Sequence, residues 1–177
     1  MHLQHRHKMN VSTYRGRHHR FRPGGAALAF VLVTAVGVAG HGEAPVPLHF
    51  ANTASTTVTV DDGTTGAADN QFDYTGSWGS SSGDSSYYDG THSWSGTVGD
   101  SVSVSFTGTQ IELFGGTGPG AGIGDVSIDG GAQYEVDFFT PSEEGNVGLW
   151  ASPILPEGHH VFTLTVAGIA NDSSPGR

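Results

Sequence analysis

Aromatic residues are concentrated in a polar stretch of the sequence, residues 72–96. The stretch reads FDYTGSWGSSSGDSSYYDGTHSWSG, so its rings are set among Ser, Gly, Asp and Thr. An aromatic plane can stack on the apolar face of a ligand, while nearby carboxylates and hydroxyls can hydrogen-bond to its polar edge. A sugar ring offers both surfaces, C–H patches on a face and hydroxyls around the edge. This stretch is therefore a candidate sugar-binding surface.

Strand alternation divides these rings between core and surface. Phe72 and Tyr74 keep the alternation of an extended strand, which predicts that both belong to the core. Tyr87 and Tyr88 are adjacent and point to opposite sides if extended, so one is expected to be exposed with Trp94. The alternative is that all the rings cover one end of the core, because aromatic residues in strands are more often packed. The candidate ligand-binding residues are Trp94, Tyr87, Tyr88, Asp89, His92, Trp78 and Trp150.

Oxygen ligands for a metal ion come together in VDDGTTGAADN, residues 60–70. Calcium prefers carboxylate and carbonyl oxygens of this kind, and its role here would be structural. The spacing is not that of an EF-hand, and Asp-Gly is also a common turn, so a simple turn is the alternative. The candidate metal ligands are Asp61, Asp62 and Asp69.

No motif indicates catalysis. The sequence contains no G-x-S-x-G elbow, no H-E-x-x-H and no P-loop. The adjacent Glu143 and Glu144 lie in TPSEEGN, which is more simply a solvated turn than a glycosidase acid and base. His159 and His160 are neighbours that face opposite sides of a strand, so a zinc site is unsupported. We therefore expect that the protein is not an enzyme.

The charge distribution separates the first 40 residues from the rest. Six of the seven Lys and Arg residues lie in the first 22 positions, and all 17 Asp and Glu residues follow position 42. A basic start, the apolar run AALAFVLVTAVGVAG and then small residues follow the order of a secretory signal peptide. We expect residues 1–40 to be this signal, cleaved after Gly40, and the protein to be secreted and extracellular. An uncleaved anchor is the alternative, although a spanning helix needs about 20 apolar residues.

Removal of the signal would leave an acidic chain without cysteine. The 17 acidic residues would then face Arg177 as the single Lys or Arg. Such a surface repels phosphate, which argues against nucleic acid and anionic membranes as partners and favours neutral ligands. Because the sequence has no Cys, no disulfide can stabilise it.

Short alternating strands recur after the signal, and no helical period is present. SVSVSF at 101–106 and HVFTLTV at 160–166 alternate most clearly. The tight turns IDGG, at Asp129–Gly131, and FTGTQI, around Gly108, predict hairpins, whereas FGGTGPGAGIGD predicts a long loop. Further strands are expected at 56–60, 72–75, 110–114, 125–128, 133–138 and 147–151. The pattern predicts an all-β antiparallel β-sandwich or jelly roll over residues 55–177, preceded by a linker or arm at 41–54.

The order of the motifs over residues 58–174 resembles the galactose-binding-like jelly-roll modules appended to secreted actinobacterial glycoside hydrolases and surface proteins. The motifs are VDD, FDYTGSW, YYDGTHSWSGTVGDSVSVSFTGTQIELFGG, VSIDGG, VDFF, LPEGHHVFTLTVAG and NDSS. The resemblance implies a non-catalytic carbohydrate-binding module, often with a structural calcium ion. A structural or adhesive sandwich without a sugar site is the alternative, since fold alone does not give function.

Modules of this kind usually continue after the NDSS segment into one more strand, which pairs near the N-terminal strand. The resemblance therefore implies that the strand at 160–167 has an open edge. We expect a monomer whose open edge can pair with another chain.

Overall fold

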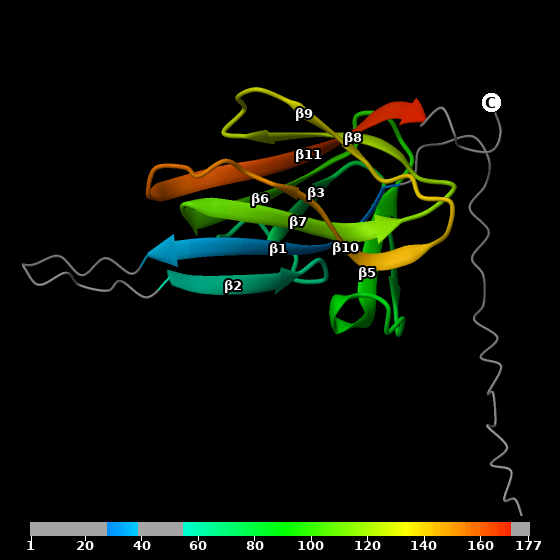
Figure 1. Cartoon of the computed structure of the whole chain (residues 1–177), viewed down its shortest axis with the longest axis horizontal. Helices are drawn as coiled ribbons and strands as arrows, with labels where there is room; N and C mark the ends of the chain where they lie inside the picture. Colours follow the sequence, from blue (N-terminus) through cyan, green and yellow to red (C-terminus); the bar gives the residue numbers. More distant parts are fainter. Residues whose placement is uncertain (1–27, 39–54, 171–177) are drawn as a thin grey trace, which may run out of the picture.

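The computed structural model describes residues 28–38 and 55–170, which form two antiparallel sheets packed face to face (Figure 1). The first sheet has the strand order β10-β7-β1-β5-β4, with β2 paired to β1, and the second has the order β3-β6-β11-β8-β9. The strands are β1 Leu28–Val38, β2 Ser55–Asp61, β3 Phe72–Thr75, β4 Gly79–Ser82, β5 Thr91–Ser95, β6 Ser101–Gly108, β7 Gln110–Thr117, β8 Gly122–Ile128, β9 Tyr134–Asp137, β10 Glu144–Ala151 and β11 Gly158–Ala170. A 3-10 turn, η1 Tyr88–Gly90, precedes β5. The expected all-β sandwich is confirmed.

The core lies between the sheets and follows the predicted alternation. Strands β6 and β11 pair with each other, and their inward residues have exposed fractions of 1% or less. These residues are Val102, Val104, Phe106, Phe162, Leu164 and Val166. Ile111 and Leu113 of β7 meet them from the first sheet. Burial of each such side chain contributes about 1.5–3 kcal/mol, which fixes the register of both sheets.

Strand β1 comes from the apolar part of the predicted signal peptide. It lies between β2 and β7 in the first sheet (Figure 1), and all three of its strand pairings are antiparallel. The residues of β1 all lie within the predicted signal peptide, so the sheet described here belongs to the uncleaved chain. Cleavage of the signal stays a prediction. The cleavage position after Gly40 and the linker at 41–54 lie outside the described residues. Within the part of the chain that the structure describes, no helix is long and apolar enough to cross a membrane.

Three local expectations are wrong. The turn at Gly108 joins β6 to β7, which lie in different sheets, so the chain crosses the sandwich there and forms no hairpin. The glycine-rich segment is mostly strand, because β7 extends to Thr117 and β8 begins at Gly122. Strand β11 lies between β6 and β8 and has no open edge. Alternation shows which residues turn inward, but it cannot show which sheet a strand joins.

Candidate functional site

The site is built on β5, whose two faces carry different chemistry. Ser93 and Ser95 are 5% and 2% exposed, and their hydroxyls donate hydrogen bonds to buried carboxylates. His92 and Trp94 alternate with these serines and are half-buried. Because side chains alternate across a strand, inward serines place both rings on the outer face of the sheet. Trp94 turns away from the core, but it is half-buried, whereas the sequence predicts an exposed ring.

Three rings form a row on this outer face, which we call the aromatic row: Tyr87, His92 and Trp94. The ring centroids of Tyr87 and His92 are 4.1 Å apart with planes inclined by 20°, so these rings are stacked. Those of His92 and Trp94 are 5.1 Å apart with planes inclined by 33°. Rings at such distances attract one another, and the row is therefore held in place by its own contacts.

Backbone hydrogen bonds close the loop that carries Tyr87. The amides of Tyr87 and Gly90 donate to the carbonyls of Asp84 and Tyr87, respectively, both at 3.1 Å. The Asp84 side chain accepts hydrogen bonds from the amide of Ser86 at 3.0 Å and from its hydroxyl at 2.6 Å. These bonds lower the pKa of Asp84, and the charge of His92 adds to the effect. Asp84 therefore carries a negative charge beside the row.

A distant segment borders the same loop. A Cβ at Gly145, in β10, would collide with the carbonyl group of Ser86, so the two backbones are in close approach. Burial raises the pKa of the Tyr87 phenol, and the carboxylates of Asp84 and Glu143 raise it further. Carboxylates from two separate segments thus flank the aromatic row. Sequence reasoning assigned Glu143 to a solvated turn, since no local signal places it near Tyr87.

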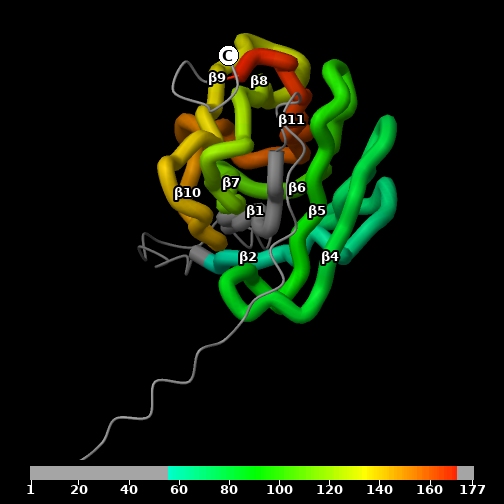
Figure 2. The backbone as a smooth tube through the Cα atoms, turned by 90° about the vertical axis from the view of Figure 1, so that its right-hand side faces the viewer, coloured from blue at the N-terminus to red at the C-terminus, as the bar shows by residue number. Residues whose placement is uncertain are grey.

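The indole of Trp94 lies across the backbone of β4. Gly79 is paired with Trp94, and a Cβ at Gly79 would come within 2.7 Å of two indole carbons. Figure 2 shows β4 and β5 side by side at one side of the molecule. A residue without a side chain is therefore needed at position 79, a requirement that the sequence pattern did not reveal.

The other predicted rings pack at the margin of the core. Phe72 is 2% exposed, and Tyr74 packs against the core, as predicted. The ring centroid of Trp78 is 5.0 Å from that of Tyr74. Trp150 lies between Phe162 and Tyr134, with centroid distances of 5.9 and 6.0 Å. Trp78 and Trp150 are thus not part of the aromatic row.

Tyr88 and Asp89 lie in η1, next to the row. Both are exposed, and the exposed fraction of Tyr88 is 41%. Asp89 has a φ of 48°, a left-handed conformation that Asp tolerates better than most residues. Of the two adjacent tyrosines, Tyr87 joins the row and Tyr88 faces solvent. The two tyrosines differ in exposure, but the one that shares the row with Trp94 is the half-buried Tyr87 and not the exposed Tyr88, because the segment is a turn and not an extended strand.

The predicted metal ligands separate into two places. Asp61 and Asp62 meet at the hydroxyl of Thr91, which lies 2.8–2.9 Å from both Asp61 oxygens and from Oδ1 of Asp62. Asp69 lies elsewhere, with its Oδ1 3.1 Å from Nε2 of His159. Among residues 28–38 and 55–170, no group of three or more His, Cys, Asp or Glu side chains is arranged to hold a metal ion. The three predicted ligands are therefore not brought together.

The Asp62 carboxyl group is almost fully buried, with an exposed fraction of 1%. Burial raises its pKa, hydrogen bonds from Ser93 and Thr91 oppose this, and the charge of Asp61 raises the pKa further. The Thr91 hydroxyl has a single proton to donate, whereas three carboxylate oxygens surround it. A proton on Asp62 or a bound cation would relieve the repulsion between these oxygens.

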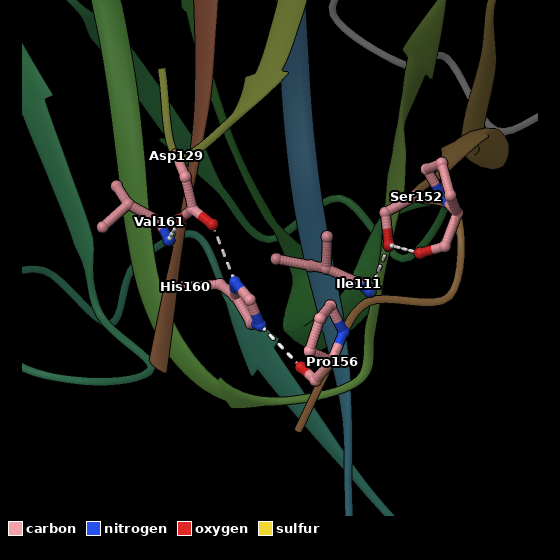
Figure 3. A network of polar contacts seen from close by, with 7 residues as sticks. Ile111, Asp129, Ser152, Pro156, His160 and Val161 are labelled. Carbon is pink, nitrogen blue, oxygen red and sulfur yellow. Dashed lines mark hydrogen bonds and ion pairs between the residues drawn. The ribbon is translucent and has the colours of Figure 1, made fainter. Parts of the chain in front are cut away.

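A second network of polar contacts lies near the start of β11. Figure 3 shows it from close by. The ring nitrogens of His160 contact Oδ2 of Asp129 at 2.8 Å and the carbonyl oxygen of Pro156 at 2.9 Å. Asp129 also accepts a hydrogen bond from the amide of Val161 at 2.8 Å. The hydrogen bond with Asp129 raises the pKa of His160 and lowers that of the carboxyl group. This pair ties the β8–β9 hairpin to β11, which is a structural role.

Comparisons with known proteins identify no family for this chain. No family model matches it, and no curated protein matches it. The resemblance to galactose-binding-like modules therefore remains a prediction.

Proposed function

We propose that the protein is a secreted, non-catalytic carbohydrate-binding module that stacks a neutral sugar on the aromatic row. The observation that carries the proposal is the row itself, with Tyr87, His92 and Trp94 aligned on the outer face of β5. Because Tyr87 and His92 cover one another's facing surfaces, a ligand with apolar patches would contact the free edges and end faces of the row.

The polar groups beside the row suit the edge of a sugar. Asp84 and Glu143 flank Tyr87, and Tyr88 and Asp89 are exposed next to it. Carboxylates and a phenol can accept or donate hydrogen bonds to sugar hydroxyls. The same carboxylates repel anionic ligands, and this favours a neutral sugar over a uronate or a sulfated glycan.

The proposal gives each residue a separate role. Trp94 is the main stacking platform, because its indole is the largest ring of the row and rests on the backbone at Gly79. Tyr87 extends the platform, and His92 holds the two rings in line. Asp89 and Tyr88 contribute hydrogen bonds from the loop tip. Trp78 and Trp150 support the core and would contact no ligand.

Structural calcium is part of the proposal, with Asp61 and Asp62 as its ligands. Their convergence on Thr91 gives a cation hard oxygen donors, whereas Asp69 lies elsewhere. The ion would stabilise the end of β2 against β5, and it would take no part in sugar binding. A proton on Asp62 is the competing explanation for the same arrangement.

The test compares Trp94→Ala with a variant of the core margin, Trp78→Ala. Retention on insoluble neutral polysaccharides and a glycan array is measured beside thermal unfolding. Loss of a stacking ring should weaken binding by about 1–3 kcal/mol, or roughly 5- to 150-fold, with the fold nearly intact. Trp78→Ala should instead destabilise the fold more than Trp94→Ala does and leave retention unchanged, because Trp78 packs on Tyr74 at the margin of the core.

Two results would contradict the proposal. One is a wild-type chain that retains no neutral polysaccharide, which would favour a structural or adhesive sandwich without a sugar site. The other is Trp94→Ala with a large loss of thermal stability and unchanged retention.

A further inference from the structure

Strand β1 is paired on both of its edges in the first sheet, and we call the space between its neighbours the place of β1. On one edge, β7 pairs with it from Ala29 to Val36. On the other edge, β5 pairs with Leu28–Phe30 and β2 with Leu32–Val38. All three neighbours run antiparallel to β1. A strand bound between them in the same way must therefore run in the direction of β1. The place accepts a strand of about the 11 residues of β1.

The strands around this place depend on its occupant. Within the described residues, β2 has no sheet partner except β1, and β2 carries the buried Val60. β7 would lose one of its two neighbours, although its Ile111 and Leu113 belong to the core. β1 also packs against β6 of the second sheet. An empty place would therefore expose unpaired amides and carbonyls on both edges and apolar surface between the sheets.

A single covalent connection links β1 to the other described strands. β1 is the first described strand, and only residues 39–54 join it to β2. A cut in that connection separates the segment from every other described strand. The predicted signal cleavage, after Gly40, falls in the same connection. Strand pairing and burial would then have to hold the segment in place without a covalent link.

We propose that the place of β1 is a peptide-binding groove for an extended apolar strand antiparallel to β7, and that Leu28–Val38 is its occupant. The sequence LAFVLVTAVGV suits this role, since it is uncharged and rich in β-branched residues that favour strands. Main-chain hydrogen bonds along both edges supply the affinity for such a strand. The inference does not depend on sugar binding, because it rests on the main-chain pairing of β1 with β7, β5 and β2 and not on the rings of the aromatic row.

The test uses the full chain with a protease site introduced into residues 41–54. The folded protein is cut and passed through size-exclusion chromatography, and hydrogen exchange is followed at β7 and β2. We expect the N-terminal fragment to remain bound after cutting. When the cut protein is unfolded and refolded with excess labelled peptide of residues 26–40, the peptide should replace the fragment. A control peptide with Val33→Pro and Ala35→Pro should not, because proline cannot donate ladder hydrogen bonds.

The outcomes separate clearly. If the fragment leaves on cutting while β7 and β2 keep their protection, the groove is not needed and the proposal is wrong. If the fragment leaves and protection is lost, added peptide decides the matter: restored protection supports the proposal, and no restoration overturns it. Polysaccharide retention by the same cut protein is scored separately, so failure here is distinct from failure of the sugar proposal.

Discussion

The Asp62 carboxyl group is almost fully buried, and its pKa is shifted. The direction of this pKa shift predicts how stability depends on pH. Its pKa is raised above the ordinary value of 3.8 in the folded protein. The folded state therefore binds this proton more tightly than the unfolded state, and the stabilisation is complete below about pH 4. It is lost as the pH rises through the folded pKa.

Asp62→Asn should remove this fall in stability with rising pH, since the amide keeps the shape and does not ionise. Urea unfolding from pH 4 to 8, with a chelator present, gives the free energy of unfolding for both proteins. As the pH rises, the free energy of unfolding of Asp62→Asn should increase relative to that of the wild type. Asp73→Asn, at an exposed position of β3, is the matched control. Parallel pH profiles for wild type and Asp62→Asn would contradict the assignment.

The His160–Asp129 pair should lose its stabilising effect at both high and low pH. The pKa of His160 is raised, so its stabilisation is complete below about pH 6.5 and is lost as the pH rises through the folded value. The pKa of Asp129 is lowered, so its stabilisation is present above about pH 4 and is lost in acid. The pair is therefore most stabilising between these limits.

Asp129→Asn keeps an oxygen for the amide of Val161 but removes the charge that faces His160. Because Asp129 is half exposed, we expect a loss of about 1 kcal/mol or less near pH 5.5, shrinking above the folded pKa of His160. Denaturant titrations at pH 5.5 and pH 9 measure this change. Glu135→Gln, at an exposed position of β9, serves as control. An equal loss at both pH values would show that the ion pair makes no contribution.

At the scale of the element, β4 and β5 form a unit in which a glycine supports a ring. Gly79→Ala would bring a Cβ against the indole of Trp94, and neither the ring nor the paired backbone can yield easily. We expect a loss of about 1–3 kcal/mol in stability, a changed tryptophan fluorescence spectrum and weakened polysaccharide retention. Ser80→Ala, at the exposed next position of β4, should change none of these. Unchanged fluorescence in Gly79→Ala would place Trp94 elsewhere.

The predictability of the elements follows from their patterns. Strands β3, β6 and β11 show strict alternation because one face of each is buried, and their positions agree with the sequence prediction. The sequence pattern does not predict strands β4 and β5, because GSSS has no apolar side chain and THSWS buries its serines and leaves its rings half-buried on the outer face. A strand that places polar groups inward gives no alternating hydrophobic signal. This inversion on β5 is also what creates the aromatic row.

At the scale of the molecule, the candidate site brings together segments that are far apart in sequence. The polar stretch 72–96 supplies all three rings of the row. Glu143 and Gly145 join from the other end of the domain through the start of β10. Their approach depends on the order of strands in the first sheet, which alternation within single strands cannot specify. Alternation within single strands also could not show that Trp78 and Trp150 lie away from the row.

The central place of β1 in the first sheet also affects how the chain can fold during synthesis. β1 leaves the ribosome first, but the strand on one of its edges, β7, ends only at Thr117. At about 5–20 residues per second, roughly 4–16 s separate the two segments. Contacts between such distant segments also form slowly once the chain is complete. Throughout this interval the apolar segment has no finished partner on that edge, and an export receptor can capture it before β7 does.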